Sequence, residues 1–179
     1  MINVSEIKAT APEIFKTDLQ RKVYESLGKL GIKYERVDTD VVITMEDCKE
    51  VNKKLDMDMV KTLFLTNTKK GQYYLFITKG RKHFNTRAFC NGLGVSRVSF
   101  APIELFEEML GTEIGAATVY SALIDPEKKI RIVFDKDVAD SEWYGGSDGT
   151  TTGYMKVKTQ DILRKFMPYT KHDYRIIIA

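Results

Sequence analysis

The sequence has little cysteine and no long apolar run. Only two cysteines, Cys48 and Cys90, occur among its 179 residues, and they form no CxxC pair. This argues against both a disulfide framework and a zinc site. No window approaches the roughly 18 apolar residues of a spanning helix, and the first residues lack a basic segment followed by an apolar one. We therefore expect a cytoplasmic protein with reduced thiols and no membrane partner.

Signatures of several enzyme classes are also missing. The two histidines, His83 and His172, lie far apart and belong to no metal-ligand motif, so we expect neither a metal nor another cofactor. Neither GxSxG nor GxxxxGK[ST] occurs, so the common serine-hydrolase and nucleotide-phosphate signatures are both absent. Cys90 could be an activated nucleophile, but a buried structural cysteine is the commoner state, and we assign it no catalytic role.

Acidic residues are missing from one long stretch, although the net charge of the chain is only +3. Between Met59 and Ile103 there is no Asp or Glu. The window contains eight basic residues, Lys61, Lys69, Lys70, Lys79, Arg81, Lys82, Arg87 and Arg97. An ordinary solvated face can carry such a run, but the complete absence of acids favours a surface for an anionic partner.

Residue patterns predict short helices interleaved with strands. Thr17 and Gln20 form a capping box before an apolar stripe that Gly31 ends, which predicts a helix over 18–30. By similar reasoning, we expect further helices over 44–55, 85–93, 102–110 and 159–166. Strands are expected over 32–37, 60–66, 73–78, 97–100, 117–123, 130–134, 154–157 and 174–178. This order predicts one α+β domain over 1–179, with a mixed, mostly antiparallel sheet flanked by short helices.

Three segments carry groups suited to chemistry. Lys61 directly precedes an apolar strand, two glycines bound the connection 111–115, and residues 144–152 form a Gly/Ser/Thr loop. Backbone N–H groups and hydroxyls of such loops can surround an anion or oxyanion. Taken singly, each segment has a plainer interpretation: a solvated strand end, a helix cap with a turn, and a flexible surface loop.

In combination, four stretches resemble the YbaK/ProX-type domain, which is also inserted in bacterial prolyl-tRNA synthetases. They are residues 44–48, 60–65, 98–111 and 119–125, and the similarity extends from about Asp18 to about Phe166. The lysine before an apolar strand and the glycine-bounded loop before the Leu-Ile-Asp segment belong together in that family.

The resemblance implies the prolyl-tRNA editing fold and a hydrolase that deacylates mischarged tRNA, with Ala-tRNA(Pro) as first candidate. Lys61 would contact the 3′-terminal adenosine, and the loop from Gly111 to Gly115 would frame the ester. Further substrate contacts are implied for Thr44, Ala116, Tyr120, Gly145, Gly146, Asp148 and Thr150. The acceptor stem would be held by Lys69, Lys70, Lys79, Arg81, Lys82, Arg87 and Arg97.

Several alternatives stay open at this point. Ile114 stands where many relatives have proline, and Gly145 and Gly146 stand in place of a His-Pro pattern, which leaves the amino acid undecided. A Cys-tRNA(Pro) deacylase, a non-catalytic tRNA-binding or synthetase-associated module, and a hydrolase of small esters are the rivals. Prolyl-tRNA synthetase is a second candidate partner. One aromatic residue could stack on the terminal adenine, among Tyr73, Tyr74, Phe76, Phe84 and Phe89.

Overall fold

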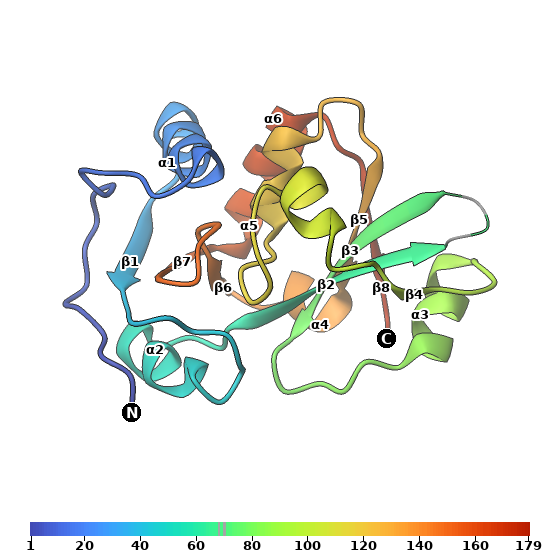
Figure 1. The fold of residues 1–179 in the computed structure, drawn as a ribbon, viewed down its shortest axis with the longest axis horizontal. Coiled ribbons are helices and arrows are strands. Elements are labelled where there is room, and N and C mark those ends of the chain that lie inside the picture. The colour runs from blue at the N-terminus through green and yellow to red at the C-terminus, as the bar shows by residue number, and fades with distance from the viewer. Residues whose placement is uncertain (68, 70) are drawn as a thin grey trace.

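The computed structural model describes residues 1–67, 69 and 71–179, and it contains two sheets (Figure 1). A three-stranded sheet has the order β1-β7-β6, and a five-stranded sheet has the order β4-β2-β3-β5-β8. Four strand pairs are antiparallel, whereas β3 with β5 and β5 with β8 are parallel. The predicted α+β class with mixed, mostly antiparallel pairing is therefore confirmed, although the strands divide into two sheets.

The three-stranded sheet is covered on both faces by helices. Its strands are β1 (Tyr34–Asp38), β6 (Trp143–Ser147) and β7 (Gly153–Lys158), and its helices are α1 (Asp18–Leu30) and α2 (Cys48–Leu55). Tyr24 of α1 packs against Tyr34 of β1, with ring centroids 5.4 Å apart. On the other face, Val51 of α2 shares a cluster with Val37 and Tyr154. Both faces of this sheet are thus buried.

The five-stranded sheet supplies most of the hydrophobic core. Its strands are β2 (Val60–Asn67), β3 (Gln72–Lys79), β4 (Ser99–Phe100), β5 (Ile130–Asp135) and β8 (Tyr174–Ile177). Successive residues of β3 point to opposite faces, so Leu75 and Ile77 join one cluster while Tyr74 and Phe76 join another with Phe89 of α3 (Thr86–Leu93). The remaining helical segments are η1 (Phe106–Leu110), η2 (Val119–Ile124), α4 (Lys136–Ala139), α5 (Thr159–Asp161), η3 (Ile162–Phe166) and α6 (Met167–Thr170).

Four local predictions are wrong. The helix expected from residue 102 begins at Phe106. Residues 119–124, expected in a strand, form the 3-10 helix η2, because the Thr118 side chain caps it and the Ser121 hydroxyl donates to the Leu110 carbonyl. The loop expected over 144–152 includes strand β6 over its first part. The helix expected from residue 44 begins at Cys48, since Thr44 and Asp47 form a hydrogen-bonded turn before it.

Two findings about the described residues concern membranes and metals. None of their helices is long and apolar enough to cross a membrane. They also contain no group of three His, Cys, Asp or Glu side chains that could hold a metal ion.

Candidate functional site

Two adjoining cavities lie where β2, the 111–117 segment and the β6–β7 turn meet. The first, which we call the Lys61 cavity, has a volume of about 370 Å³ and is lined by Lys61, Gly115 and mostly apolar side chains. The second, the threonine cavity, has a volume of about 730 Å³ and is lined by Gly111 and by Thr150, Thr151 and Thr152. Four apolar residues border both cavities, Ile43, Ile103, Phe106 and Ile114.

Lys61 is the only lysine that lines the Lys61 cavity among the described residues. Its place in β2 opposite Thr78 of β3 fixes its backbone, and its Nζ donates to the carbonyl oxygen of Lys82. The side chain is half-buried, and this burial lowers the pKa of the Lys61 ammonium from its usual value. Partial burial leaves the ammonium less hydrated than that of a surface lysine, which strengthens its interaction with an anion.

The loop from Gly111 to Gly115 brings backbone donors to the same place. Gly111 and Gly115 have φ angles of +66° and +91°, the left-handed region that favours glycine. A Cβ atom on Gly115 would lie 3.1 Å from the Cα of Ile43, so a larger residue would push the cavity wall outward. Ile114 and Gly115 are exposed, and within the described residues their amides donate to no partner.

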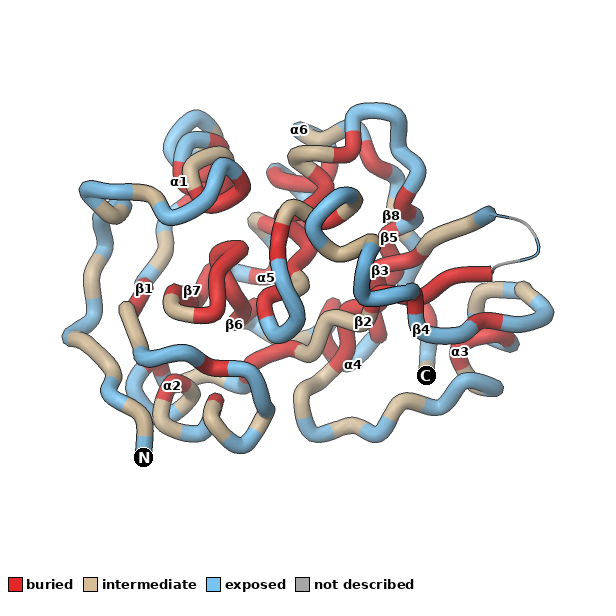
Figure 2. Tube along the Cα trace, in the orientation of Figure 1, coloured by how far each residue is buried: buried red, intermediate tan, exposed pale blue. Residues whose placement is uncertain are grey.

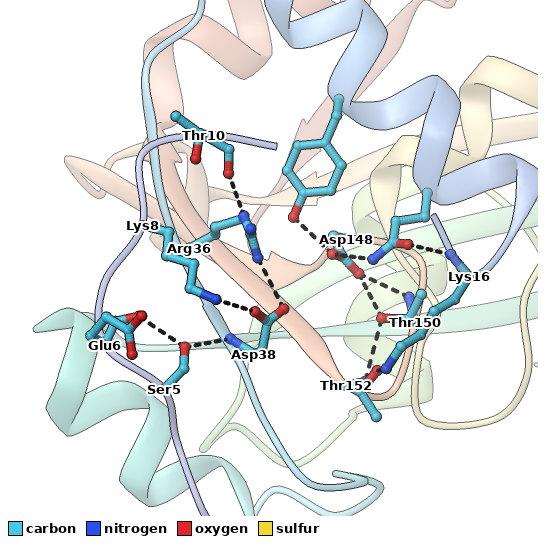
Figure 3. A network of polar contacts seen from close by, with 12 residues as sticks. Ser5, Glu6, Lys8, Thr10, Lys16, Arg36, Asp38, Asp148, Thr150 and Thr152 are labelled. Atoms are coloured by element: carbon cyan, nitrogen blue, oxygen red, sulfur yellow. Dashed lines mark hydrogen bonds and ion pairs between the residues drawn. The ribbon is translucent and has the colours of Figure 1, made fainter. Parts of the chain in front are cut away.

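The β6–β7 turn is fixed by a buried carboxylate. Asp148 is 1% exposed, and its Oδ2 accepts hydrogen bonds from the side chains of Gln20, at 2.9 Å, and Tyr24, at 2.8 Å. Its Oδ1 accepts from the amide of Thr150, at 3.2 Å, and from the Thr150 hydroxyl, at 2.7 Å (Figure 3). Asp148 thus ties the turn to α1. All four bonds lie inside the protein, so Asp148 holds the turn that lines the threonine cavity, and its predicted substrate contact stays a prediction.

The chain matches known proteins over most of its length. Residues 39–165 match the aminoacyl-tRNA editing domain family. The chain belongs to this family. The prolyl-tRNA editing protein ProX of Acetoanaerobium sticklandii is 26% identical over 121 residues, 68% of this chain and 74% of that protein. The prolyl-tRNA synthetase associated domain-containing protein 1 of Danio rerio is 25% identical over 175 residues, 94% of this chain and 91% of that protein.

Solved structures share the fold of this editing domain. A crystal structure of a candidate trans-editing enzyme for prolyl-tRNA synthetase superposes with a TM-score of 0.63 at 15% identity, covering 92% of this chain and 99% of that one. A hypothetical protein superposes with a TM-score of 0.68 at 18% identity, covering 87% and 98%. The likeness supports the prediction of the editing-domain fold.

Several residues predicted to contact substrate line neither cavity of the editing domain. Ala116 and Tyr120 are both 0% exposed, and the Tyr120 ring packs edge-on against Phe166, with ring centroids 5.2 Å apart. Thr44 is exposed, and its hydroxyl donates to Asp47 at 2.9 Å. For these three, the structure shows packing or capping in place of the predicted contact.

The glycine pair of β6 is also a packing feature. A Cβ atom on Gly145 would collide with the Met57 side chain, and one on Gly146 would lie 3.3 Å from the Tyr144 hydroxyl. Both glycines are buried and line neither cavity. The absence of a side chain at Gly145 leaves room for Met57, which follows α2, and Gly146 lies against the Tyr144 hydroxyl of its own strand.

Acidic residues from other segments lie close to some basic residues of the 59–103 window. Lys82 lies 2.7 Å from the buried Asp135 and 2.9 Å from Asp137; burial opposes its charge, but hydrogen bonds to these carboxylates raise the pKa of Lys82. Lys82 thus lies in an ion pair, and its predicted contact with a phosphate stays a prediction. Arg81 lies 3.6 Å from Asp58 at the surface.

The other basic residues differ in how open they are. Lys69, Arg87 and Arg97 are exposed, and Lys79 is partly buried. Lys70 lies outside the described residues. Exposed side chains of this kind can contact phosphates, so Lys69, Arg87 and Arg97 remain the clearest cations of the predicted acceptor-stem surface.

Some residues of the site were not predicted from the sequence. Phe100, Ile43 and Ile103 line the Lys61 cavity, and Lys16 donates from Nζ to the Thr152 hydroxyl at 2.5 Å in the threonine cavity. Phe100 lies in one of the four stretches that resemble the family, which could have directed attention to it. Cys48 also lines the Lys61 cavity, but burial raises the pKa of its thiol to about 11, so the thiol is protonated at neutral pH.

Proposed function

We propose that this editing domain is a trans-editing hydrolase that removes alanine from mischarged proline tRNA, Ala-tRNA(Pro), by attack of water on the aminoacyl ester. The observation that carries the proposal is that Lys61 and Gly115, from segments far apart in the chain, line one cavity. The names of the A. sticklandii relative and of the structural neighbour, which refer to prolyl-tRNA editing, support the choice of tRNA.

The proposed chemistry needs no catalytic triad. An aminoacyl ester is already activated, so the site has to orient the ester, admit water and stabilise the oxyanion. The amides of Ile114 and Gly115 are the candidate oxyanion donors, since they have no partner among the described residues. The Lys61 ammonium would anchor the terminal ribose-phosphate by charge, and the ribose 2′-hydroxyl would help to deliver or activate the water.

The shape of the Lys61 cavity suits a small, uncharged amino acid. Its volume is about 370 Å³ and its wall includes Met45, Met59 and Val60, so it offers apolar contact to an uncharged side chain, with Lys61 as its one basic residue among those described. Apolar contact alone discriminates weakly between side chains of nearly equal size. Cys-tRNA(Pro) is therefore the second candidate substrate.

A deacylation panel tests the proposal. Purified protein is mixed with Ala-, Cys- and Ser-charged tRNA(Pro) and with correctly charged Pro-tRNA(Pro), and ester loss is followed over time. We expect fastest loss of Ala-tRNA(Pro) and an intact Pro-tRNA(Pro). Fastest loss of Cys-tRNA(Pro) would make the chain a cysteine editor.

Absence of hydrolysis in the whole panel would instead favour a non-catalytic module associated with prolyl-tRNA synthetase. The D. rerio relative carries such an association in its name. Binding of the chain to purified prolyl-tRNA synthetase, with and without tRNA(Pro), is the matching measurement for that partner.

A further inference from the structure

Phe100 is the most exposed aromatic side chain of the described residues, with 62% of its surface open. It lies in β4, the edge strand of the five-stranded sheet, and Figure 2 shows β4 as an exposed segment beside buried strands. Its ring contacts Phe84, with centroids 5.8 Å apart, and Phe84 contacts the buried Phe89 at 5.9 Å. The Phe100 ring is therefore supported by the protein on one side and open to solvent on another.

Phe100 is part of an apolar platform at the Lys61 cavity. Ile43 and Ile103 line the same cavity and are 57% and 63% exposed. We define these three residues as the platform. Exposed apolar side chains that gather beside a cavity mark a contact surface, because leaving them in water is unfavourable.

Positive charge accompanies the aromatic ring. In the sequence, Phe100 lies three positions after Arg97, which is exposed. Lys61 lines the same cavity as Phe100. An open aromatic ring beside cations is how proteins hold unpaired nucleotides, since every base has a flat face and every phosphate a negative charge. A protein partner would explain only the exposed apolar residues, whereas RNA would explain both the apolar and the basic residues.

We propose that Phe100 stacks on an unpaired base at the 3′ end of the bound tRNA and so holds the terminal ester against Lys61. This inference rests on the proposed function for the identity of the RNA. Stacking is largely independent of base identity and of salt, whereas phosphate contacts weaken as salt rises. Phe100 therefore supplies affinity that the exposed arginines cannot supply, and it selects single-stranded over paired nucleotides.

The test is direct binding of uncharged tRNA(Pro), so it does not depend on hydrolysis. Fluorescence anisotropy compares the wild type with Phe100→Leu, Phe100→Trp and Tyr169→Leu, on intact tRNA and on tRNA without its three 3′-terminal nucleotides. Tyr169 is the matched control, an exposed aromatic residue on α6 at 42% exposure that lines neither cavity.

For intact tRNA, we expect Phe100→Leu to bind about 10-fold more weakly, equivalent to about 1.4 kcal/mol, and Phe100→Trp to bind like the wild type. For shortened tRNA, Phe100→Leu should equal the wild type, and Tyr169→Leu should equal it on both RNAs. The 10-fold factor should persist across salt concentrations, whereas Arg97→Ala should flatten the salt dependence.

If Phe100→Leu and the wild type bind intact tRNA equally well, the proposal is overturned. The platform would then bind a different partner, such as a protein. An equal loss on intact and shortened tRNA would overturn it as well, because the contact would lie elsewhere on the RNA. If no charged tRNA is hydrolysed but the Phe100 effect is present, the stacking contact stands and the proposed hydrolase fails.

Discussion

Replacing Asp148 with asparagine should destabilise the protein far more than a surface substitution does. The two carboxylate oxygens accept four hydrogen bonds, two from α1 and two from Thr150, and the residue is 1% exposed. An asparagine amide puts an NH2 group where one oxygen stood, so two of the four donors lose their acceptor. A hydrogen bond to a charged group contributes about 1.5–3 kcal/mol, and rotation of the hydroxyls recovers part of the loss.

We therefore expect Asp148→Asn to lower the free energy of unfolding by about 3 kcal/mol. In a chain of this length, that change lowers Tm by about 6–12 °C. Urea unfolding can be followed by the fluorescence of Trp143, the single tryptophan, which lies in β6 close to the turn. Deacylation should fall too, because the displaced turn lines the threonine cavity.

Asp173→Asn is the matched control for this experiment. Asp173 is exposed, so the same chemical change should leave the unfolding curve nearly unchanged. If Asp148→Asn shifts the free energy of unfolding by less than about 0.5 kcal/mol, the carboxylate does not hold the turn and our interpretation of Figure 3 is wrong.

Three further predictions concern the Lys82 ion pair, the loop at Gly115 and the Lys61 ammonium. Lys82→Met leaves the buried Asp135 carboxylate without its cation. Because Lys82 is one-third exposed, we expect the free energy of unfolding in urea to fall by about 1–2 kcal/mol. Lys82→Arg should restore most of this loss. Gly115→Ala, with φ at +91° and its Cβ 3.1 Å from Ile43, should slow deacylation on the order of 10-fold in single-turnover assays; an unchanged rate would contradict the proposed wall contact. Burial lowers the pKa of the Lys61 ammonium, which is the proposed active form. As pH rises, the catalysed rate, corrected for spontaneous ester loss, should therefore begin to fall at a pH below the usual lysine pKa of about 10.4. A corrected rate that keeps rising through that range would show that the charge is not needed.

Local signals in the sequence were sufficient for several elements. The Thr17 side chain accepts from the Gln20 amide at the start of α1, and Gly31 ends the helix with φ at +64°, as predicted. The strands β2 and β3 were also predicted, over residues 60–66 and 73–78, from their apolar runs. Each of these features depends on residues close together in the chain, so composition and spacing suffice to reveal it.

Contacts between distant residues could not be predicted. The segment from Val119 to Ile124 has the composition of a buried strand, and only the Ser121 bond to Leu110 and the packing around it make it a helix. The pairing of Lys82 with Asp135 joins residues more than fifty positions apart, so an acid-free window in the sequence overstated the free charge.

The site itself was predicted in part. Lys61 and Gly115 were proposed from the sequence, and they line one cavity. Asp148 was proposed as a substrate contact, but its partners Gln20 and Tyr24 come from the far end of the chain and enclose it. Phe100 is exposed because β4 is short and lies at a sheet edge, which no periodicity in the sequence reveals.

Single-turnover deacylation of Ala-tRNA(Pro) by Lys61→Ala, beside the wild type, is the most direct test of how this editing domain works. The account predicts that the variant loses deacylation while its urea unfolding curve stays close to that of the wild type, because Lys61 is half-buried and its ammonium bonds to one carbonyl. Wild-type deacylation by a folded Lys61→Ala protein would contradict the account.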